Sequence, residues 1–124
     1  MDIEAQMETS NPNDQLPLTE AEFHILLVLS AGENHGYAIM KAIEEHPEIG
    51  ISLGPATLYR TIRRLLERGM IKELEDRPDP EFEDERRRYY RLTAAGRKVM
   101  EAEMERLSNV ISLARKWQAK GSLG

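Results

Sequence analysis

Arginine side chains recur along residues 54–69, a segment with the apolar spacing of an amphipathic helix. On a helical wheel one face carries Leu58, Ile62, Leu65 and Leu66, and the other carries Thr57, Arg60, Arg63, Arg64 and Glu67. A guanidinium group can donate two parallel hydrogen bonds to guanine O6 and N7, or it can bind a phosphate. We therefore expect Thr57, Arg60 and Arg64 to face a DNA major groove. Arg63 and Arg68 lie nearer the flanks and are expected to contact the DNA backbone. A solvated helix face with arginines paired to Glu67 fits the same pattern, so this segment alone leaves both interpretations open.

Three adjacent arginines, Arg86, Arg87 and Arg88, follow a segment whose two prolines predict a loop. Adjacent guanidinium groups beside such a loop can neutralise phosphates along a DNA groove. The acidic run at residues 81–85 can instead fold back and pair with the same arginines. We expect the arginine cluster to contact phosphates, and pairing with the acidic run is the alternative.

The three histidines, His24, His35 and His46, recur every eleven residues, but no acidic residues near them have the spacing of metal ligands. The chain has no cysteine, so it can form neither a disulfide nor a thiolate metal site. It has no glycine-rich phosphate loop and no serine in a nucleophile-elbow motif. We therefore expect no metal, no cofactor and no enzymatic activity.

The chain has 124 residues, which predicts one domain, and a formal net charge of -5. Its acids are concentrated in residues 1–22, which hold six Asp and Glu residues and no Lys or Arg. The rest carries 16 acidic and 17 basic side chains, and attraction to DNA depends on local potential. No apolar run reaches the roughly 18 residues of a membrane span, and the acidic N-terminus differs from a secretory signal, so we expect a cytoplasmic protein.

The segments around the arginine-rich helix are expected to be mainly helical. Residues 1–17 are polar and acidic, which predicts a disordered arm, whereas Thr19 and Glu22 form a capping box that starts the first helix. The further expected elements are a helix over 36–45, a strand-like stretch at 49–53, the helix over 54–69, strands at 71–75 and 88–92, and a last helix over 94–118 capped by Thr93. The sequence thus predicts a mainly α fold with a small β-hairpin, which is the layout of a winged helix-turn-helix.

The last helix carries an apolar seam whose residues are spaced 4, 3, 4 and 3 positions apart, a coiled-coil-like pattern. The seam consists of Met100, Met104, Leu107, Ile111 and Ala114, and Trp117 extends it. A domain this small covers such a seam only by packing on the first helix or on a second chain, and we expect a homodimer. A two-fold dimer would hold two groove-binding helices roughly 34–36 Å apart, about one DNA turn. Trp117 is interpreted as an interface anchor, with the wall of an aromatic-ligand pocket as the alternative.

Over about residues 18–107, the order and spacing of five short motifs resemble the PadR family of bacterial winged-helix transcriptional regulators. The matching segments are Leu18–Phe23, His35–Ile39, Gly54–Tyr59, Leu65–Ile71 and Arg88–Gly96. The His-Gly-Tyr turn, the Thr-Leu-Tyr helix and the Tyr-Tyr-x-Leu-Thr-x-x-Gly end are the most specific. The resemblance implies a repressor that binds double-stranded operator DNA as a homodimer. In many members an aromatic or drug-like small molecule releases the DNA.

The resemblance also implies that Tyr37, Thr57 and Tyr59 contact DNA together with the arginines after the proline-bearing loop. Arg60 departs from the family pattern, because many members have proline there, and it adds charge to the reading surface. The single last helix resembles the short subgroup of the family, which leaves little room for a separate effector domain.

We therefore interpret residues 18–93 as a winged helix-turn-helix DNA-binding domain and residues 94–120 as a dimerisation helix. The predicted function is that of a sequence-specific transcriptional repressor that acts as a homodimer, with an aromatic small molecule as a candidate effector. The alternative is a winged-helix protein-interaction module without DNA binding, which the acidic arm and the net charge favour.

Overall fold

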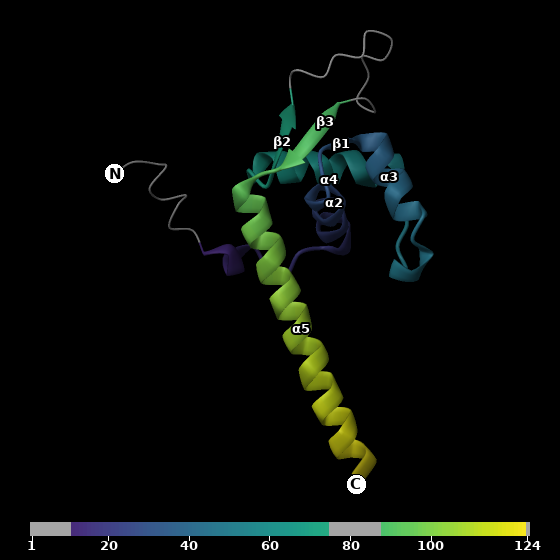
Figure 1. Ribbon diagram of the computed structural model, residues 1–124, viewed down its shortest axis with the longest axis vertical. Coiled ribbons are helices and arrows are strands. Elements are labelled where there is room, and N and C mark those ends of the chain that lie inside the picture. Colours follow the sequence, from purple (N-terminus) through teal and green to yellow (C-terminus); the bar gives the residue numbers. More distant parts are fainter. Residues whose placement is uncertain (1–10, 75–87, 124) are drawn as a thin grey trace, which may run out of the picture.

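The computed structural model describes residues 11–74 and 88–123. In chain order its elements are the 3-10 helix η1 (Pro12–Gln15), α2 (Glu20–Ser30), β1 (Asn34–His35), α3 (Gly36–Glu44), the 3-10 helix η2 (Pro47–Ile49), α4 (Pro55–Glu67), β2 (Ile71–Leu74), β3 (Tyr89–Leu92) and α5 (Ala94–Leu123). Figure 1 shows the shorter helices and the strands gathered at one end, from which α5 extends as a single long rod. This mainly α architecture with a small antiparallel sheet confirms the predicted fold class.

Two predicted caps set where α2 and α5 begin. At α2, the Thr19 hydroxyl accepts the Glu22 N–H at 3.1 Å, and the Glu22 carboxylate accepts the Thr19 N–H at 2.8 Å. At α5, the Thr93 hydroxyl accepts the Gly96 N–H at 3.0 Å and donates to the Gly69 carbonyl at 2.7 Å. The first turn of α5 is thereby fastened to the turn that follows α4.

Gly96 tightens the same junction. A Cβ at this position would lie 1.9 Å from the carbonyl oxygen of Met70, so the backbones approach more closely than any other residue would allow. The start of α5 therefore packs directly on the segment that joins α4 to β2.

The sheet has three strands in the order β1-β3-β2, all antiparallel, where the sequence predicts a two-stranded hairpin. Tyr90 on the central strand lies opposite Asn34 on one side and Glu73 on the other. The strand β1 has only two residues, too few to show an alternating pattern. The strand-like stretch predicted at 49–53 is wrong, because η2 ends at Ile49 and Gly50 has a φ of 74°, which breaks extended backbone.

The N-terminal segment is ordered where it is described. Residues 11–17 contain η1, and Leu16 packs against the core beside the buried Leu18. Figure 1 shows η1 lying next to α5. The predicted disordered arm is therefore wrong for residues 11–17, because Leu16 has an apolar surface to pack against, and residues 1–10 lie outside the described part of the chain.

The core lies between α2, α3, α4, the sheet and the first turns of α5. Its largest members include Ile25, Leu26, Leu29, Ile39, Ile43, Leu58, Ile62, Leu65, Met70, Tyr90 and Met100. The apolar face predicted for α4 is buried at Leu58, Ile62 and Leu65, which confirms that part of the helical wheel. Because that face points inward, the arginine-bearing face of α4 points to solvent.

Candidate nucleic-acid interface

The outer face of α4 presents Thr57, Arg60 and Arg63 to solvent. Neither arginine has an ion-pair partner among the residues that the structure describes. Residues three apart lie on adjacent turns of a helix, so the two guanidinium groups form one short cationic strip. Such a strip can bind phosphates or the edges of bases in a groove.

The other two arginines of this region turn toward α2. Arg68 Nη1 lies 2.5 Å from Glu22 Oε2, and Arg68 also donates to Gln15 Oε1 from Nε at 3.0 Å. Arg64 Nη1 lies 3.8 Å from the same Glu22 oxygen, and its side chain is 43% exposed. Arg68, expected to touch the DNA backbone, is therefore half-buried and paired with groups of its own chain, and Arg64 lies at the edge of the outer face instead of its centre.

Tyr59 faces the interior of the domain. Its ring packs against the start of α3, where a Cβ on Gly36 would lie 2.7 Å from a ring carbon, and its hydroxyl oxygen is buried. The structure therefore corrects the expectation that the Tyr59 side chain contacts DNA, because it spaces α3 from α4. Tyr37 is exposed near the start of α3, with Lys41 Nζ 5.8 Å from its ring centroid, and it remains a candidate contact.

The arginine cluster after the loop is only partly described. Arg86 and Arg87 lie outside the described residues, whereas Arg88 has an exposed side chain whose Nε is 3.5 Å from Glu73 Oε1. Lys72 on β2 lies opposite Arg91 on β3, and both are exposed. Lys72 was missed by the sequence reasoning, although the alternation of β2 places it on the exposed side of that strand.

The predicted seam on α5 divides into a buried start and an exposed remainder. Met100 is only 5% exposed and belongs to the core of this chain, which corrects its assignment to a partner-facing surface. Leu107 is half-buried, and the other seam residues are exposed: Met104, Ile111, Ala114 and Trp117. One chain thus covers only the first part of the seam.

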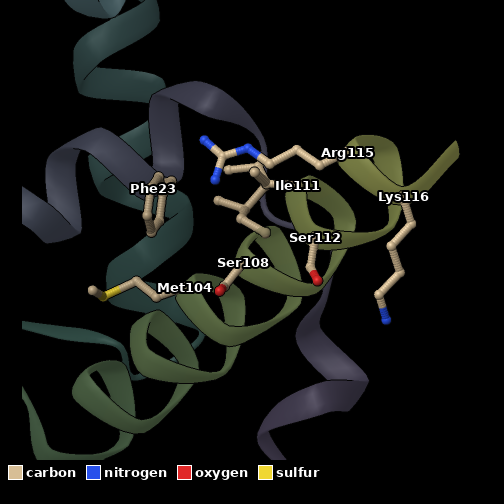
Figure 2. Close-up of a pocket in the computed structure, with 8 residues that line it drawn as sticks. Phe23, Met104, Ser108, Ile111, Ser112, Arg115 and Lys116 are labelled. Carbon is tan, nitrogen blue, oxygen red and sulfur yellow. The ribbon is translucent and has the colours of Figure 1, made fainter. Parts of the chain in front are cut away.

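A groove of about 580 Å³ lies where the seam leaves the core. Figure 2 shows Phe23 of α2 beside Met104 and Ile111 of α5, with the Arg115 side chain extending toward Phe23 and Lys116 pointing elsewhere. The floor of this groove is apolar and its far end is cationic. No sequence pattern indicates it, because Phe23 is distant in sequence from every other residue that lines it.

Glu103 is a second buried carboxylate and ties the N-terminal segment to α5. Its Oε2 accepts the Leu18 N–H at 2.7 Å, and its Oε1 accepts from Arg106 Nε at 2.5 Å. This hydrogen bond raises the pKa of the Arg106 guanidinium above its ordinary value. The contact with Leu18 spans 85 positions, so helical periodicity contains no sign of it.

Within the described ranges 11–74 and 88–123, no group of three or more His, Asp or Glu residues is placed to hold a metal ion. None of the helices in these ranges is long and apolar enough to cross a membrane.

A family model for transcriptional regulators of the PadR-like family matches residues 25–102, well over half of the chain. Among curated proteins, an uncharacterized 37.1 kDa protein in transposon TN4556 of Streptomyces fradiae is 38% identical over 92 residues. That alignment covers 72% of this chain but 24% of the relative, so the chain spans about a quarter of that protein's length.

Solved structures share the fold. A transcriptional regulator from Clostridium thermocellum is 28% identical, with a TM-score of 0.65, 77% of this chain covered and 89% of that one. A PadR family transcription regulator from Clostridium difficile is 22% identical, with a TM-score of 0.66 and coverage of 81% and 99%. PadR of Bacillus subtilis in complex with operator DNA is 22% identical, with a TM-score of 0.60 and coverage of 71% and 47%.

Proposed function

The chain belongs to the PadR-like family of transcriptional regulators, and from this premise we propose that it binds operator DNA through the outer face of α4. The observation that carries the proposal is the exposed cationic strip of Arg60 and Arg63, which has no ion-pair partner in the described residues. The likeness in fold to the Bacillus subtilis PadR that was solved in complex with operator DNA supports DNA as the partner in this proposal.

We assign the contacts within this proposal according to exposure. Thr57 and Arg60 read base edges in the major groove, and Arg63 binds a phosphate. Arg64 joins them from the edge of the helix, and Tyr37 lies near the backbone at the start of α3. The arginines Arg86, Arg87 and Arg88 contact phosphates beside the groove, because adjacent guanidinium groups neutralise the charge of the DNA backbone.

The proposed regulator acts as a homodimer joined through α5. Residues 108–121 are exposed in the single chain, and they include the large apolar side chains of Ile111, Leu113 and Trp117. Contiguous exposed apolar surface of this kind marks a site of association. A two-fold dimer would present two copies of α4 to successive turns of DNA, which suits a repressor that occupies an operator inside the cell.

The groove beside Phe23 is the proposed effector site. Its volume of about 580 Å³ and its apolar floor suit a small aromatic compound, and Arg115 can pair with an acidic group on it. A thermal-shift screen of aromatic acids tests this role. Compounds that raise the Tm and also weaken DNA binding support it, and compounds that raise the Tm without any effect on DNA binding contradict it.

The experiment for DNA binding uses duplexes selected from a random-sequence pool. We expect tight binding to selected duplexes, weaker binding to unselected ones, and affinity that falls steeply as salt rises. A protein-interaction module is the second candidate, favoured by the net charge of -5. Absence of binding to any duplex at low salt would favour that module over the DNA-binding function.

A further inference from the structure

Glu22 has more partners than its capping role requires. Its Oε1 accepts the Thr19 N–H at 2.8 Å, as in other capping boxes. Its Oε2 faces two arginines from the end of α4, Arg68 at 2.5 Å and Arg64 at 3.8 Å. The Glu22 side chain is only 4% exposed, so this single buried carboxylate connects the start of α2 to two cations near the DNA-facing helix.

The two arginines are held unequally. Arg68 donates to Glu22 and also, through Nε and Nη2, to the side chain of Gln15 at 3.0 and 2.5 Å. Among the residues that the structure describes, Arg64 has one ion-pair contact, the 3.8 Å approach to Glu22, a distance that lies beyond a hydrogen bond. Arg68 already neutralises the Glu22 carboxylate and is also held by Gln15. Arg64 can therefore move away from Glu22 without leaving a buried charge unpaired.

We propose that Glu22 is a positioning residue for DNA binding: it holds Arg64 at the side of α4 in the free protein and yields it to a phosphate when DNA binds. The inference rests on the proposed DNA-binding function. Arg60 and Arg63 can bind DNA without breaking an ion pair within the described part of the chain. Arg64 must first leave the Glu22 carboxylate before it binds a DNA phosphate. Glu22 therefore moderates DNA affinity instead of supplying it.

The test is the cost of Arg64→Ala in DNA affinity, measured in three versions of the full chain: unaltered, Glu22→Gln and Arg68→Gln. The Glu22→Gln change keeps the size of the side chain and an oxygen for the Thr19 N–H, but it removes the attraction for Arg64. We expect Arg64→Ala to cost about two- to five-fold more in the Glu22→Gln background, which is the strength of a partly exposed ion pair.

Arg68→Gln should change the result in the opposite direction. Without Arg68, Arg64 is the remaining cation that faces Glu22 among the described residues, and Glu22 holds it more tightly, so Arg64→Ala should cost less than in the unaltered protein. A purely structural role for Glu22 does not produce opposite signs in the two backgrounds. A melting curve will show whether each background folds. If one does not fold, the test is whether the cost of Arg64→Ala in the other background rises or falls as expected relative to the unaltered protein.

Arg63→Ala is the matched control, because Arg63 lies on the same helix and has no pair with Glu22 among the described residues. Its cost should be the same in all three backgrounds. An equal cost of Arg64→Ala in all three would overturn the inference and leave the proposed function intact. If the unaltered protein binds no DNA at low salt, the proposed function fails and the inference fails with it.

Discussion

The outer face of α4 and the distal part of α5 are both exposed, but for opposite chemical reasons. On α4 the exposed groups include Arg60 and Arg63, whose guanidinium groups are well solvated in water. On α5 they include Ile111 at 52% and Trp117 at 66% exposure, whose apolar surface is unfavourable in water. The first surface is stable before any partner arrives, whereas the second gains free energy from being covered.

This difference predicts that substitutions on the two surfaces affect different properties of the protein. Variants on α5 should change how chains associate, and their effects should be large because apolar interfaces concentrate free energy in a few side chains. Variants on α4 should change DNA binding and leave both folding and association unaffected, since these side chains contact little of their own chain.

The largest effect is expected from Ile111→Asp, which places a charge in the centre of the exposed stripe. We expect the proposed dimer to weaken by about 2–4 kcal/mol, or roughly 30- to 1000-fold in its dissociation constant. Sedimentation velocity across a concentration series measures this change. Asn109→Asp, which introduces the same charge about half a helical turn away, should leave the mass unchanged. The homodimer proposal fails if the unaltered chain sediments as a monomer at every concentration.

Arg60→Ala should have the next largest effect. If Arg60 pairs with a base edge, its loss should cost about 1–3 kcal/mol for selected duplexes and relax the preference at one position. Fluorescence anisotropy with selected and random duplexes separates these outcomes. Lys98→Ala, an exposed cation at the start of α5, serves as the control. Unchanged affinity for selected duplexes would remove Arg60 from the reading surface.

Arg63→Ala should have a smaller and more uniform effect. A phosphate contact weakens binding to selected and random duplexes alike when it is lost, and the slope of log K against log salt should become shallower by about 0.9. The measurement is a salt titration of both duplex types. If Arg63→Ala weakened binding to selected duplexes alone, Arg63 would instead contact a base, as proposed for Arg60.

Arg88→Ala should have the smallest effect, about 0.5 kcal/mol or less, because Glu73 at 3.5 Å already offsets part of its charge. The complementary change, Glu73→Gln, should strengthen DNA binding slightly by releasing Arg88. Both variants are compared by anisotropy at low salt, where such weak contacts are least screened. Equal behaviour of Glu73→Gln and the unaltered chain would show that Arg88 does not reach DNA.

Much of the fold follows from local rules that act within a few residues. The Thr19 cap, the Thr93 cap and the inward face of α4 were all predicted correctly, because each depends on spacing along a single helix. The strand β1 was missed because two residues carry no alternation. Residues 11–17 were misjudged because their polar composition hides Leu16, which packs against the core.

The candidate site was predicted less completely, since exposure depends on what lies across space. Periodicity placed the arginines of α4 on a common side but does not show which of them finds an acid. Glu22 and Gln15 reach Arg68 across 46 and 53 positions of sequence. Met100 shares the spacing of the seam, yet its place near the start of α5 puts it inside the core.

Spacing, caps and motif order were sufficient to assign the α-helices, the two strands of the hairpin, the winged-helix layout and the family, because these properties depend on residues that are neighbours in the chain. Which arginines are exposed and which are paired with an acid could be learned only from the tertiary structure. A guanidinium group is drawn to whichever carboxylate lies within a few ångströms, and for Arg64 and Arg68 that carboxylate is Glu22 of a different helix.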